Sequence, residues 1–370
     1  MTATKNVYEL YDALHAIPEV GFEEVKTAAF LAEKLKKAGF AVQTGVGRTG
    51  VVGTLRAQSP GPVLGLRADM DALPYVVDGK PCAKHTCGHD AHCAMVLTAA
   101  LMAAGQGIRK GTLKILFQPS EEPDNGALEV IKDKAIDDMD YLFAMHIRPK
   151  QEIRCGQATP AMLHGSCYML TAAIEGVSAH AGRPHLAVSA VDAAVLATNA
   201  INAIHADPNI QNSAKVTMIQ SGGNGEALNT IPDRAKMAID LRAQTNPIMR
   251  ELIDKVTFAV EQSAAVIGAR ATVTNLGGVP AAENNEEAVK LAAEAIAEVL
   301  GPGNVVPQVV SPGGDDFNYY LQHKPTLKST YIGLGTDASP GLHHPEMRFT
   351  KEAMENGVRI FEYLIRKILG

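Results

Sequence analysis

The chain has 370 residues, which is enough for two or three domains with full hydrophobic cores. Its net charge is −6, no block of basic residues occurs, and no apolar run approaches the ~20 residues of a membrane-spanning helix. These features argue against a nucleic-acid partner and against a membrane protein. Five cysteines are an odd number and favour a reducing compartment over a disulfide framework. Because the first residues also lack a signal-peptide core, we expect a cytoplasmic protein.

The first 150 residues alternate helical and extended patterns. Amphipathic helices are predicted at 6–17 and 22–38, followed by strands at 40–44, 51–55 and 63–67. A helix at 93–103 and strands at 112–117 (TLKILF) and 141–145 (YLFAM) come next. The strand at 63–67 is a near-continuous apolar run and the one at 112–117 is mostly apolar, as is typical of strands buried on both faces. This alternation predicts an α/β fold with a mostly parallel sheet.

The pattern changes near residue 165 and returns near residue 279. Between these points, strands at 168–175, 216–221 and 235–241 and helices at 186–204 and 247–267 predict a compact α+β unit with an antiparallel sheet. A helix at 286–300, strands near Val305 and at 326–332, and a terminal helix from Lys351 restore the α/β character. We therefore expect a catalytic domain formed by residues 1–165 and 279–370, with residues 166–278 inserted into it.

Residues 85–92 (HTCGHDAH) hold three histidines, a thiol and a carboxylate. Imidazole and thiolate are preferred ligands of borderline-soft divalent metals. A lone His or Cys is more often a packed residue, but several such groups lie where strands of one sheet are predicted to end, and parallel sheets bind ligands there. The candidate metal ligands are Cys87, His89, Glu122, His146 and His343. Five ligands exceed one tetrahedral centre and predict two metals that share a bridging group.

Glu121 and Glu122 follow the strand at 112–117 directly. Adjacent carboxylates at such a position are often only a solvated turn. At a metal site, however, one of them can be a ligand while the other accepts a proton from the attacking water. Hydrolysis of an unreactive amide needs such a base beside a cation.

Three polar residues of the inserted unit are candidates for contact with a substrate. His180 lies in a loop of small residues, where it could cap the next helix or donate a hydrogen bond to an oxyanion. Asn229 and Arg242 lie at the two ends of a predicted strand. Arginine suits bidentate capture of a carboxylate, but a surface salt bridge is an equally good interpretation of Arg242.

Together these motifs resemble the two-metal metallopeptidase family of the aminoacylases and glutamate-type carboxypeptidases. Within it, the chain is most similar to the amidohydrolase branch of bacterial aminoacylase-like, hippurate-hydrolase-like and auxin-conjugate-hydrolase-like enzymes. The resemblance spans nearly the whole chain. The motifs that carry it are residues 15–24 (HAIPEVGFEE), 66–74 (LRADMDALP), 85–92, 117–122 (FQPSEE), 145–146, 178–181 (SAHA), 229–233 (NTIPD) with Arg242, 314–317 (GDDF) and 343–345 (HHP).

This resemblance implies a role for each candidate residue. The five ligands named above would hold two divalent metals, with His343 rather than His344 as the last ligand. Glu121 would be the general base and then the acid that protonates the leaving amine, and His180 would stabilise the oxyanion in its own or a neighbouring subunit. The remaining roles go to Asn229 and Arg242, which would orient a substrate carboxylate, to Gly314 in a segment near the substrate, and to Asp69 and Asp90, which would orient ligand imidazoles. The family's lid domain corresponds to the inserted unit.

We therefore expect a metal-dependent amidohydrolase that cleaves N-acyl amino acids or related small amides with a free carboxylate. The segments 123–127 and 314–317 depart from the family pattern, which leaves a dipeptidase, a carboxypeptidase or an aryl-amine hydrolase open. A hydrolase with Cys87 as the nucleophile and a non-catalytic binding protein are further alternatives. Zn, Mn, Co and Ni all suit such a site. An exposed strand edge in the inserted unit would favour a homodimer or higher homo-oligomer.

Overall fold

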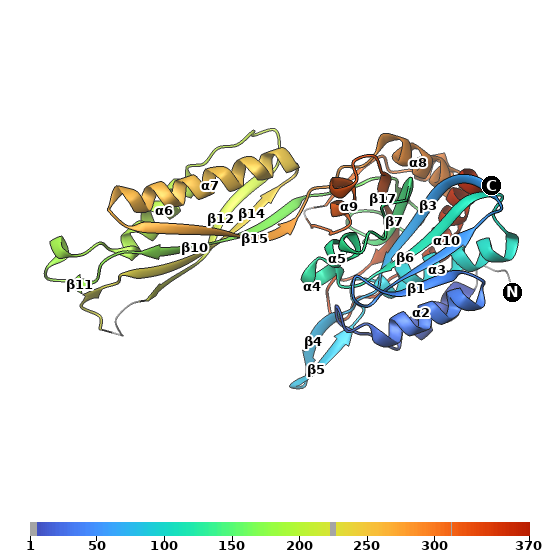
Figure 1. The fold of residues 1–370 in the computed structure, drawn as a ribbon, viewed down its shortest axis with the longest axis horizontal. Helices are drawn as coiled ribbons and strands as arrows, with labels where there is room; N and C mark the ends of the chain where they lie inside the picture. The colour runs from blue at the N-terminus through green and yellow to red at the C-terminus, as the bar shows by residue number, and fades with distance from the viewer. Residues whose placement is uncertain (1–5, 223–226, 312) are drawn as a thin grey trace. The chain divides into compact units, whose positions relative to one another are not determined.

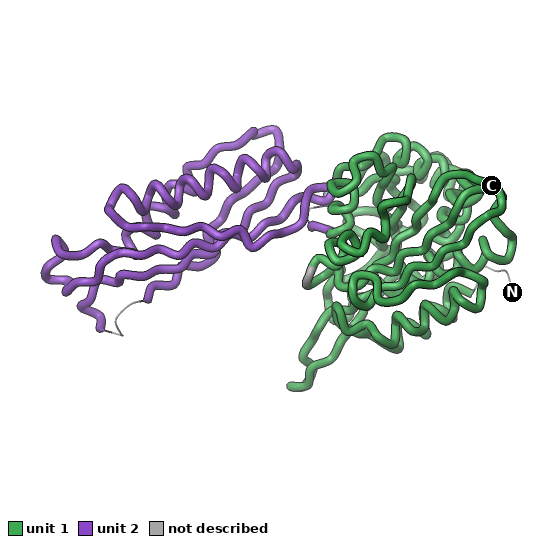
Figure 2. The backbone as a smooth tube through the Cα atoms, viewed as in Figure 1, with its two compact units in different colours: residues 1–163, 283–310, 316–370 green, residues 164–282, 311–315 purple. Residues whose placement is uncertain are grey.

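The computed structural model describes residues 6–222, 227–311 and 313–370. The chain forms two compact units (Figure 2). Unit 1 comprises residues 1–163, 283–310 and 316–370, and unit 2 comprises residues 164–282 and 311–315. The sequence-based prediction placed the insertion at 166–278. It did not include the short second segment at 311–315, which has no periodic pattern of its own.

Unit 1 is built on a seven-stranded sheet (Figure 1). Its strands, in spatial order, are β1 (Ala41–Val46), β2 (Gly50–Arg56), β6 (Lys110–Gln118), β3 (Ser59–Asp69), β7 (Tyr141–Pro149), β17 (Lys328–Ala338) and β8 (Ala158–Thr159). The four neighbours β6, β3, β7 and β17 are parallel, whereas β1, β2 and β8 pair antiparallel at the edges. The predicted α/β class with a mostly parallel sheet is confirmed.

Both faces of this sheet are buried, which explains the continuous apolar runs of its central strands. Ile115 and Phe117 of β6 pack on one face, whereas Leu116 packs on the other. The first face is covered by α1 (Asn6–His15), α2 (Val25–Lys37), α3 (His89–Gln106), α8 (Glu286–Leu300) and α10 (Ala353–Leu369). The second is covered by α5 (Gly126–Lys132) and α9 (Asn318–His323). Successive side chains of a strand point to opposite faces, and here both faces are covered, so neither set of side chains is polar.

Four details of unit 1 differ from the predictions. Helix α3 begins at His89 rather than Cys93. The buried polar side chains of its first turn are hydrogen-bonded, His89 to Asp71 and His92 to Asp69. His146 lies inside β7 rather than after it. The strand expected near Val305 is β16 (Val309–Ser311) instead, and Val305 forms only an isolated bridge with Ala158. A hairpin of β4 (Leu73–Val77) and β5 (Lys80–Lys84), joined by an Asp78–Gly79 turn, was not predicted.

Unit 2 has a four-stranded antiparallel sheet with the order β12-β14-β10-β15, and its helices α6 and α7 cover one face (Figure 1). In chain order its elements are β10 (Ser166–Glu175), α6 (Ala190–Asn202), β12 (Asn212–Gly222), β14 (Arg234–Ala243), α7 (Asn246–Val266) and β15 (Arg270–Val279). This is the predicted order. The short strands β11 (Ala179–His180) and β13 (Thr230–Ile231) pair separately.

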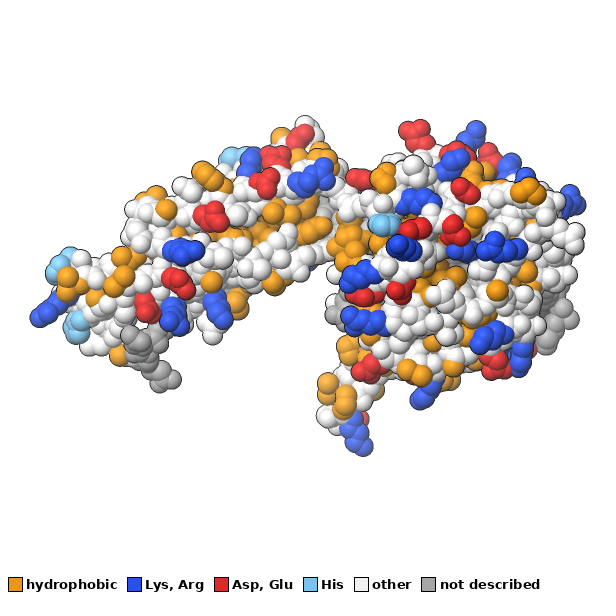
Figure 3. All heavy atoms as spheres, in the orientation of Figure 1, with side chains coloured by type: hydrophobic (Ala, Val, Ile, Leu, Met, Phe, Trp, Pro, Cys, Tyr) orange, Lys and Arg blue, Asp and Glu red, His pale blue; other side chains and the backbone are white. Residues whose placement is uncertain are grey.

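The surface of both units mixes charges of the two signs. On the face in Figure 3, acidic and basic side chains are interspersed, and neither sign forms a continuous field. Among the helices of the described residues, none is both long enough and apolar enough to cross a membrane.

Candidate metal centre

The predicted ligands come from segments that meet at the carboxyl ends of the parallel strands. The short helix α4 (Glu121–Asp124), which follows β6 and the residue 120 turn, carries Glu122. The start of α3 carries His89, and the loop after β17 carries His343. Strand β7 carries His146. Loops that follow neighbouring parallel strands lie at the same edge of a sheet, so residues far apart in sequence converge there.

Cys87 lies at the centre of this group. Its Sγ is 3.3 Å from His146 Nε2 and 3.3 Å from His343 Nε2. The ligand atoms of Cys87, His89 and His146 lie within 4.8 Å of one another, and so do those of Cys87, Glu122 and His343. The thiol belongs to both trios, so its sulfur is placed where two neighbouring cations could share it. All five predicted ligands therefore lie together in unit 1.

Glu121 lies beside the two trios. Its carboxylate is within 4.8 Å of a ring nitrogen of His89 and a carboxylate oxygen of Glu122. A carboxylate at this distance can exchange a proton with a water held among the ligands, directly or through one hydrogen-bonded neighbour.

A buried aspartate, Asp71, fixes two of the ligands at once. Its Oδ1 is 3.0 Å from His89 Nδ1, and its Oδ2 accepts the backbone N–H of Glu122 at 3.1 Å. The first contact keeps the proton on Nδ1 and leaves the Nε2 lone pair for a cation. The sequence analysis missed this role, although Asp71 stands two residues after Asp69 in the segment that leaves β3.

The His146 ring and the His343 backbone are also held by groups outside the trios. His146 Nδ1 donates to the carbonyl of Ile147 at 2.6 Å, so its Nε2 faces Cys87 with a lone pair. The backbone N–H of His343 donates to Thr86 O at 2.9 Å, and the Tyr75 hydroxyl donates to His343 O at 2.6 Å. His344 points elsewhere, since its Nδ1 accepts the Glu346 N–H at 3.1 Å.

Gly88 is required at the step between the first two ligands. Its φ is +90°, which favours glycine, and a Cβ there would lie 2.3 Å from Ile147 Cδ1. Any side chain would push Cys87 and His89 away from β7. The glycine thus lets α3 begin against the strand that carries His146.

The donor set fits divalent cations. His89 Nε2 is buried, and among the described residues it has no hydrogen-bond partner. An unsatisfied buried nitrogen is costly, and a cation would satisfy it. Another trio within reach, Asp69, His89 and His92, fits less well. Both ring nitrogens of His92 are engaged, one 2.7 Å from Asp69 Oδ1 and the other accepting the Ile147 N–H at 3.0 Å.

Burial raises the pKa of the Cys87 thiol to about 12, and the charge of Glu122 acts in the same direction. Without a cation the sulfur is therefore a thiol at neutral pH. A cysteine nucleophile must be a thiolate, so this environment disfavours the alternative of a metal-independent Cys87 hydrolase.

Asp69 lies beside one candidate ligand, and Asp90 contacts a different histidine. Asp69 Oδ2 is 3.6 Å from His89 Nε2 and its Oδ1 is 2.7 Å from His92 Nδ1, whereas Asp90 Oδ2 lies 2.6 Å from His15 Nδ1. Burial opposes ionisation of Asp69, but His89 and Arg67 outweigh it and hold the pKa of this carboxyl well below its usual value. The Asp90 carboxylate thus contacts His15 and not the imidazole of a candidate ligand. The sequence analysis gave His15 no such role.

Two of the predicted substrate residues lie near the β11–β13 pair of unit 2. His180 Nε2 is 3.3 Å from Asn229 Nδ2, and both side chains are exposed. His180 Nδ1 accepts the Gly182 N–H at 3.0 Å, which fixes the ring within its own loop. His180 does not cap a helix, because the next long helix, α6, is capped by Ser189. A ligand that approaches His180 Nε2 would have to share it with Asn229 or displace that side chain.

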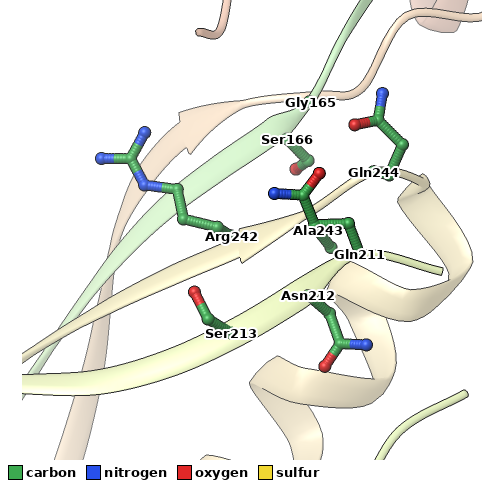
Figure 4. A pocket seen from close by; sticks show the side chains of 8 residues that line it. All are labelled: Gly165, Ser166, Gln211, Asn212, Ser213, Arg242, Ala243 and Gln244. Atoms are coloured by element: carbon green, nitrogen blue, oxygen red, sulfur yellow. The ribbon is translucent and has the colours of Figure 1, made fainter. Parts of the chain in front are cut away.

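Arg242 lines a pocket of about 290 Å³ at one end of the unit 2 sheet (Figure 4). The other lining residues are neutral and mostly polar: Gly165, Ser166, Gln211, Asn212, Ser213, Ala243 and Gln244. The guanidinium makes a bidentate pair with Asp240, with distances of 2.8 and 2.9 Å. The salt bridge considered in the sequence analysis is thus present, and a substrate carboxylate would have to compete with Asp240 or share Arg242 with it.

Gly314, the last predicted substrate residue, also belongs to unit 2. A Cβ at this position would lie 2.1 Å from Val279 Cγ2, so the Val279 side chain occupies the space that a larger residue would need. This packing accounts for the residue type without a ligand.

Comparisons with known proteins agree with the geometry. Residues 65–367 match the model of peptidase family M20/M25/M40. The chain belongs to this family. The resemblance inferred from the motifs is thereby confirmed, and the M20 chain is a hydrolase that acts on amide C–N bonds.

Named relatives of the M20 chain include two small-amide hydrolases. One is the N-acetyl-L-cysteine deacetylase of Bacillus subtilis, 31% identical over 364 residues that cover 95% of this chain and 86% of that protein. Another is the hippurate hydrolase of Campylobacter jejuni, 31% identical over 375 residues that cover 96% and 94%. Among solved structures, a dinuclear metal-binding M20 peptidase of Bacillus subtilis is 25% identical with a TM-score of 0.82, covering 99% of this chain and 98% of that one.

Proposed function

We propose that the protein is a two-metal amidohydrolase that cleaves N-acyl amino acids, or closely related small amides that bear a carboxylate, to an acid and an amine. The observation that carries this proposal is the pair of ligand trios that share Cys87 beside Glu121. The N-acetylcysteine- and hippurate-hydrolysing relatives support the substrate class, because both names describe the amide of an amino acid.

Cys87, His89, Glu122, His146 and His343 would hold the two cations, which we take to be Zn, Mn, Co or Ni. When bound, divalent cations polarise an amide carbonyl and lower the pKa of a nearby water. Glu121 accepts a proton from the attacking water and delivers it to the nitrogen of the leaving amine. His180 donates a hydrogen bond to the oxyanion, from its own or a neighbouring subunit, and Asn229 and Arg242 orient the carboxylate.

The edge strand β12 supports a homodimer through unit 2. Among the residues that the structure describes it pairs with β14 alone, and its side chains Met218 and Ile219 are exposed. An unpaired strand with apolar residues is suited to pairing with a second copy. Sedimentation at equilibrium tests this assembly, and a monomer at micromolar concentration would contradict it.

The function is tested with protein depleted of cations by a chelator and then reloaded with Zn, Mn, Co or Ni. N-acetyl-L-cysteine, hippurate, other N-acyl amino acids, dipeptides and aryl amides form the substrate panel. We expect hydrolysis of acylated amino acids that disappears on depletion and returns on reloading. Undiminished hydrolysis by depleted protein would refute the proposal, and hydrolysis of dipeptides alone would assign the site to a dipeptidase.

A further inference from the structure

The N-terminal motif 15–24 contacts the metal centre at several points, although none of its residues is a predicted ligand. The carbonyl of Glu19 accepts the Ala72 N–H at 2.7 Å, directly after Asp71. His15 contacts Asp90, which follows the ligand His89. Glu24 contacts the turn that carries Glu121. The motif thus holds three of the segments that form the site, and its contact with the Glu121 turn is the most buried.

Glu24 is 0% exposed, and both its carboxylate oxygens accept hydrogen bonds. Oε1 accepts the backbone N–H of Ser120 at 2.8 Å, and Oε2 accepts the hydroxyl of Thr49 at 2.5 Å. A buried carboxylate is costly unless it is satisfied in this way, and its hydrogen bonds to N–H groups are stronger than neutral ones. The residue thus forms a rigid link between the β1–β2 region and residue 120.

The turn that Glu24 holds is unfavourable by itself. Ser120 has φ +51°, in the left-handed region that a non-glycine residue rarely adopts. Gly21 packs directly against it, since a Cβ on Gly21 would lie 2.4 Å from Ser120 Oγ. The direction in which Glu121 leaves the turn depends on this backbone conformation.

Helix capping does not account for the Glu24 carboxylate. Glu24 occupies the N-cap position of α2, but its side chain makes no capping hydrogen bond. Glu19 has that role, because its carboxylate accepts the N–H groups of Lys26 and Thr27 at 3.1 and 2.9 Å. The Glu24 side chain is therefore directed to the turn and not to its own helix.

We propose that Glu24 is a positioning residue for the general base: its buried carboxylate holds Ser120 in the left-handed conformation and thereby aims Glu121. The proposal rests on the function proposed above. Glu122 has an independent support, since Asp71 accepts its N–H. Loss of Glu24 should therefore displace the base more than the ligand beside it.

The test compares Glu24→Ala with Glu24→Gln, which keeps an oxygen for the Ser120 N–H. With N-acetyl-L-cysteine or hippurate, whichever the wild type hydrolyses, we expect Glu24→Ala to lower kcat at least tenfold. KM and the dissociation constant of Zn or Mn should stay within about twofold. Glu24→Gln should keep kcat within about threefold of the wild type. Asp140→Ala is the control, because the Asp140 carboxylate also accepts a backbone N–H, that of Val63 in β3 at 2.8 Å, but Asp140 precedes β7 and is not part of the Ser120 turn.

A second readout needs neither activity nor cations. Hydrogen exchange at the Ser120 amide of cation-free protein should accelerate in Glu24→Ala and stay near the wild-type rate in Glu24→Gln and Asp140→Ala. If Glu24→Ala does not fold, Thr49→Val replaces it, because it removes one partner of Glu24 and should give a smaller fall in kcat with the same unchanged KM.

Unchanged kcat in folded Glu24→Ala, an equal loss in Glu24→Gln, or a parallel fall in cation affinity would overturn the positioning role. A wild-type protein inactive on the whole panel would instead overturn the proposed function, and the exchange measurement would still decide whether Glu24 holds the turn.

Discussion

The metal centre of unit 1 and the substrate candidates of unit 2 differ in how firmly their side chains are held. Cys87 and His89 are 7% and 1% exposed, and most ligands are oriented by a further group such as Asp71. In unit 2, His180 and Asn229 are exposed, and the Arg242 side chain is 47% exposed. Most of the candidate ligands are thus pre-organised by burial, and His343, with a side chain 52% exposed, is the exception. The groups that would choose the substrate lie on a surface that can change at little cost to stability.

The largest expected effect concerns the base. Glu121→Gln removes both proton transfers while its amide keeps nearly the same shape, so kcat should fall on the order of a thousandfold or more. The cation content measured by elemental analysis and the melting temperature should stay at wild-type values. Turnover near the wild-type rate would contradict the assignment of Glu121 as the base.

A ligand substitution should affect binding before it affects the fold. His343→Ala removes a nitrogen that lies 3.3 Å from Cys87 Sγ and 3.0 Å from Glu122 Oε1, so one cation should be lost or bound at least tenfold more weakly. His344→Ala is the control, since the His344 ring accepts the Glu346 N–H of its own loop. If elemental analysis shows the loss in His344→Ala instead, the ligand has been assigned to the wrong histidine.

The sequence predicted that the five candidate ligands lie close together, and the reason is physical. Glu122 follows an apolar strand, His146 lies on one, and Cys87 stands just before the apolar helix α3. The parallel topology brings such positions to one edge of the sheet. Binary pattern and topology together are then enough to place residues far apart in sequence near one another.

The groups that orient the ligands were harder to predict. Asp71 and Glu24 each make two hydrogen bonds, and their partners depend on exact register and, for Glu24, on a left-handed residue. Hydrophobic periodicity encodes neither. The family resemblance implied that Asp90 orients a ligand imidazole, but its side chain contacts His15. The β4–β5 hairpin was missed because its strands are short and half exposed, although Asp78–Gly79 is a strong hairpin signal.

In unit 2 the sharpest test is Arg242→Ala. If Arg242 binds the carboxylate, KM for the N-acyl amino acid should rise roughly tenfold or more, as expected for loss of a charged hydrogen-bonding partner, with little change in kcat. An amide without the carboxylate should lose nothing. If Arg242 is only a surface partner of Asp240, KM and stability should both stay almost unchanged, because exposed ion pairs contribute little.

The smallest expected effect tests how far pre-organisation extends in unit 1. The Tyr75 hydroxyl lies 2.7 Å from Thr86 Oγ1 and donates to the carbonyl of His343, so it links the two loops that precede Cys87 and carry His343. Tyr75→Phe removes only this link. A typical hydrogen bond contributes about 0.5–1.5 kcal/mol, so cation affinity should fall roughly two- to tenfold while the ligands themselves remain.

Tyr8→Phe is the matched control for this substitution, because it removes a hydroxyl that donates to Glu355 at 2.7 Å between α1 and α10. It should leave cation affinity unchanged, as measured by competition with a fluorescent chelator. Equal affinities in the two variants would show that the hairpin covers the site without orienting it. A fall in cation affinity in Tyr75→Phe alone would show that a single hydrogen bond contributes to the pre-organisation of the site in unit 1. The substitution alters no candidate ligand atom and frees only the loop that carries His343.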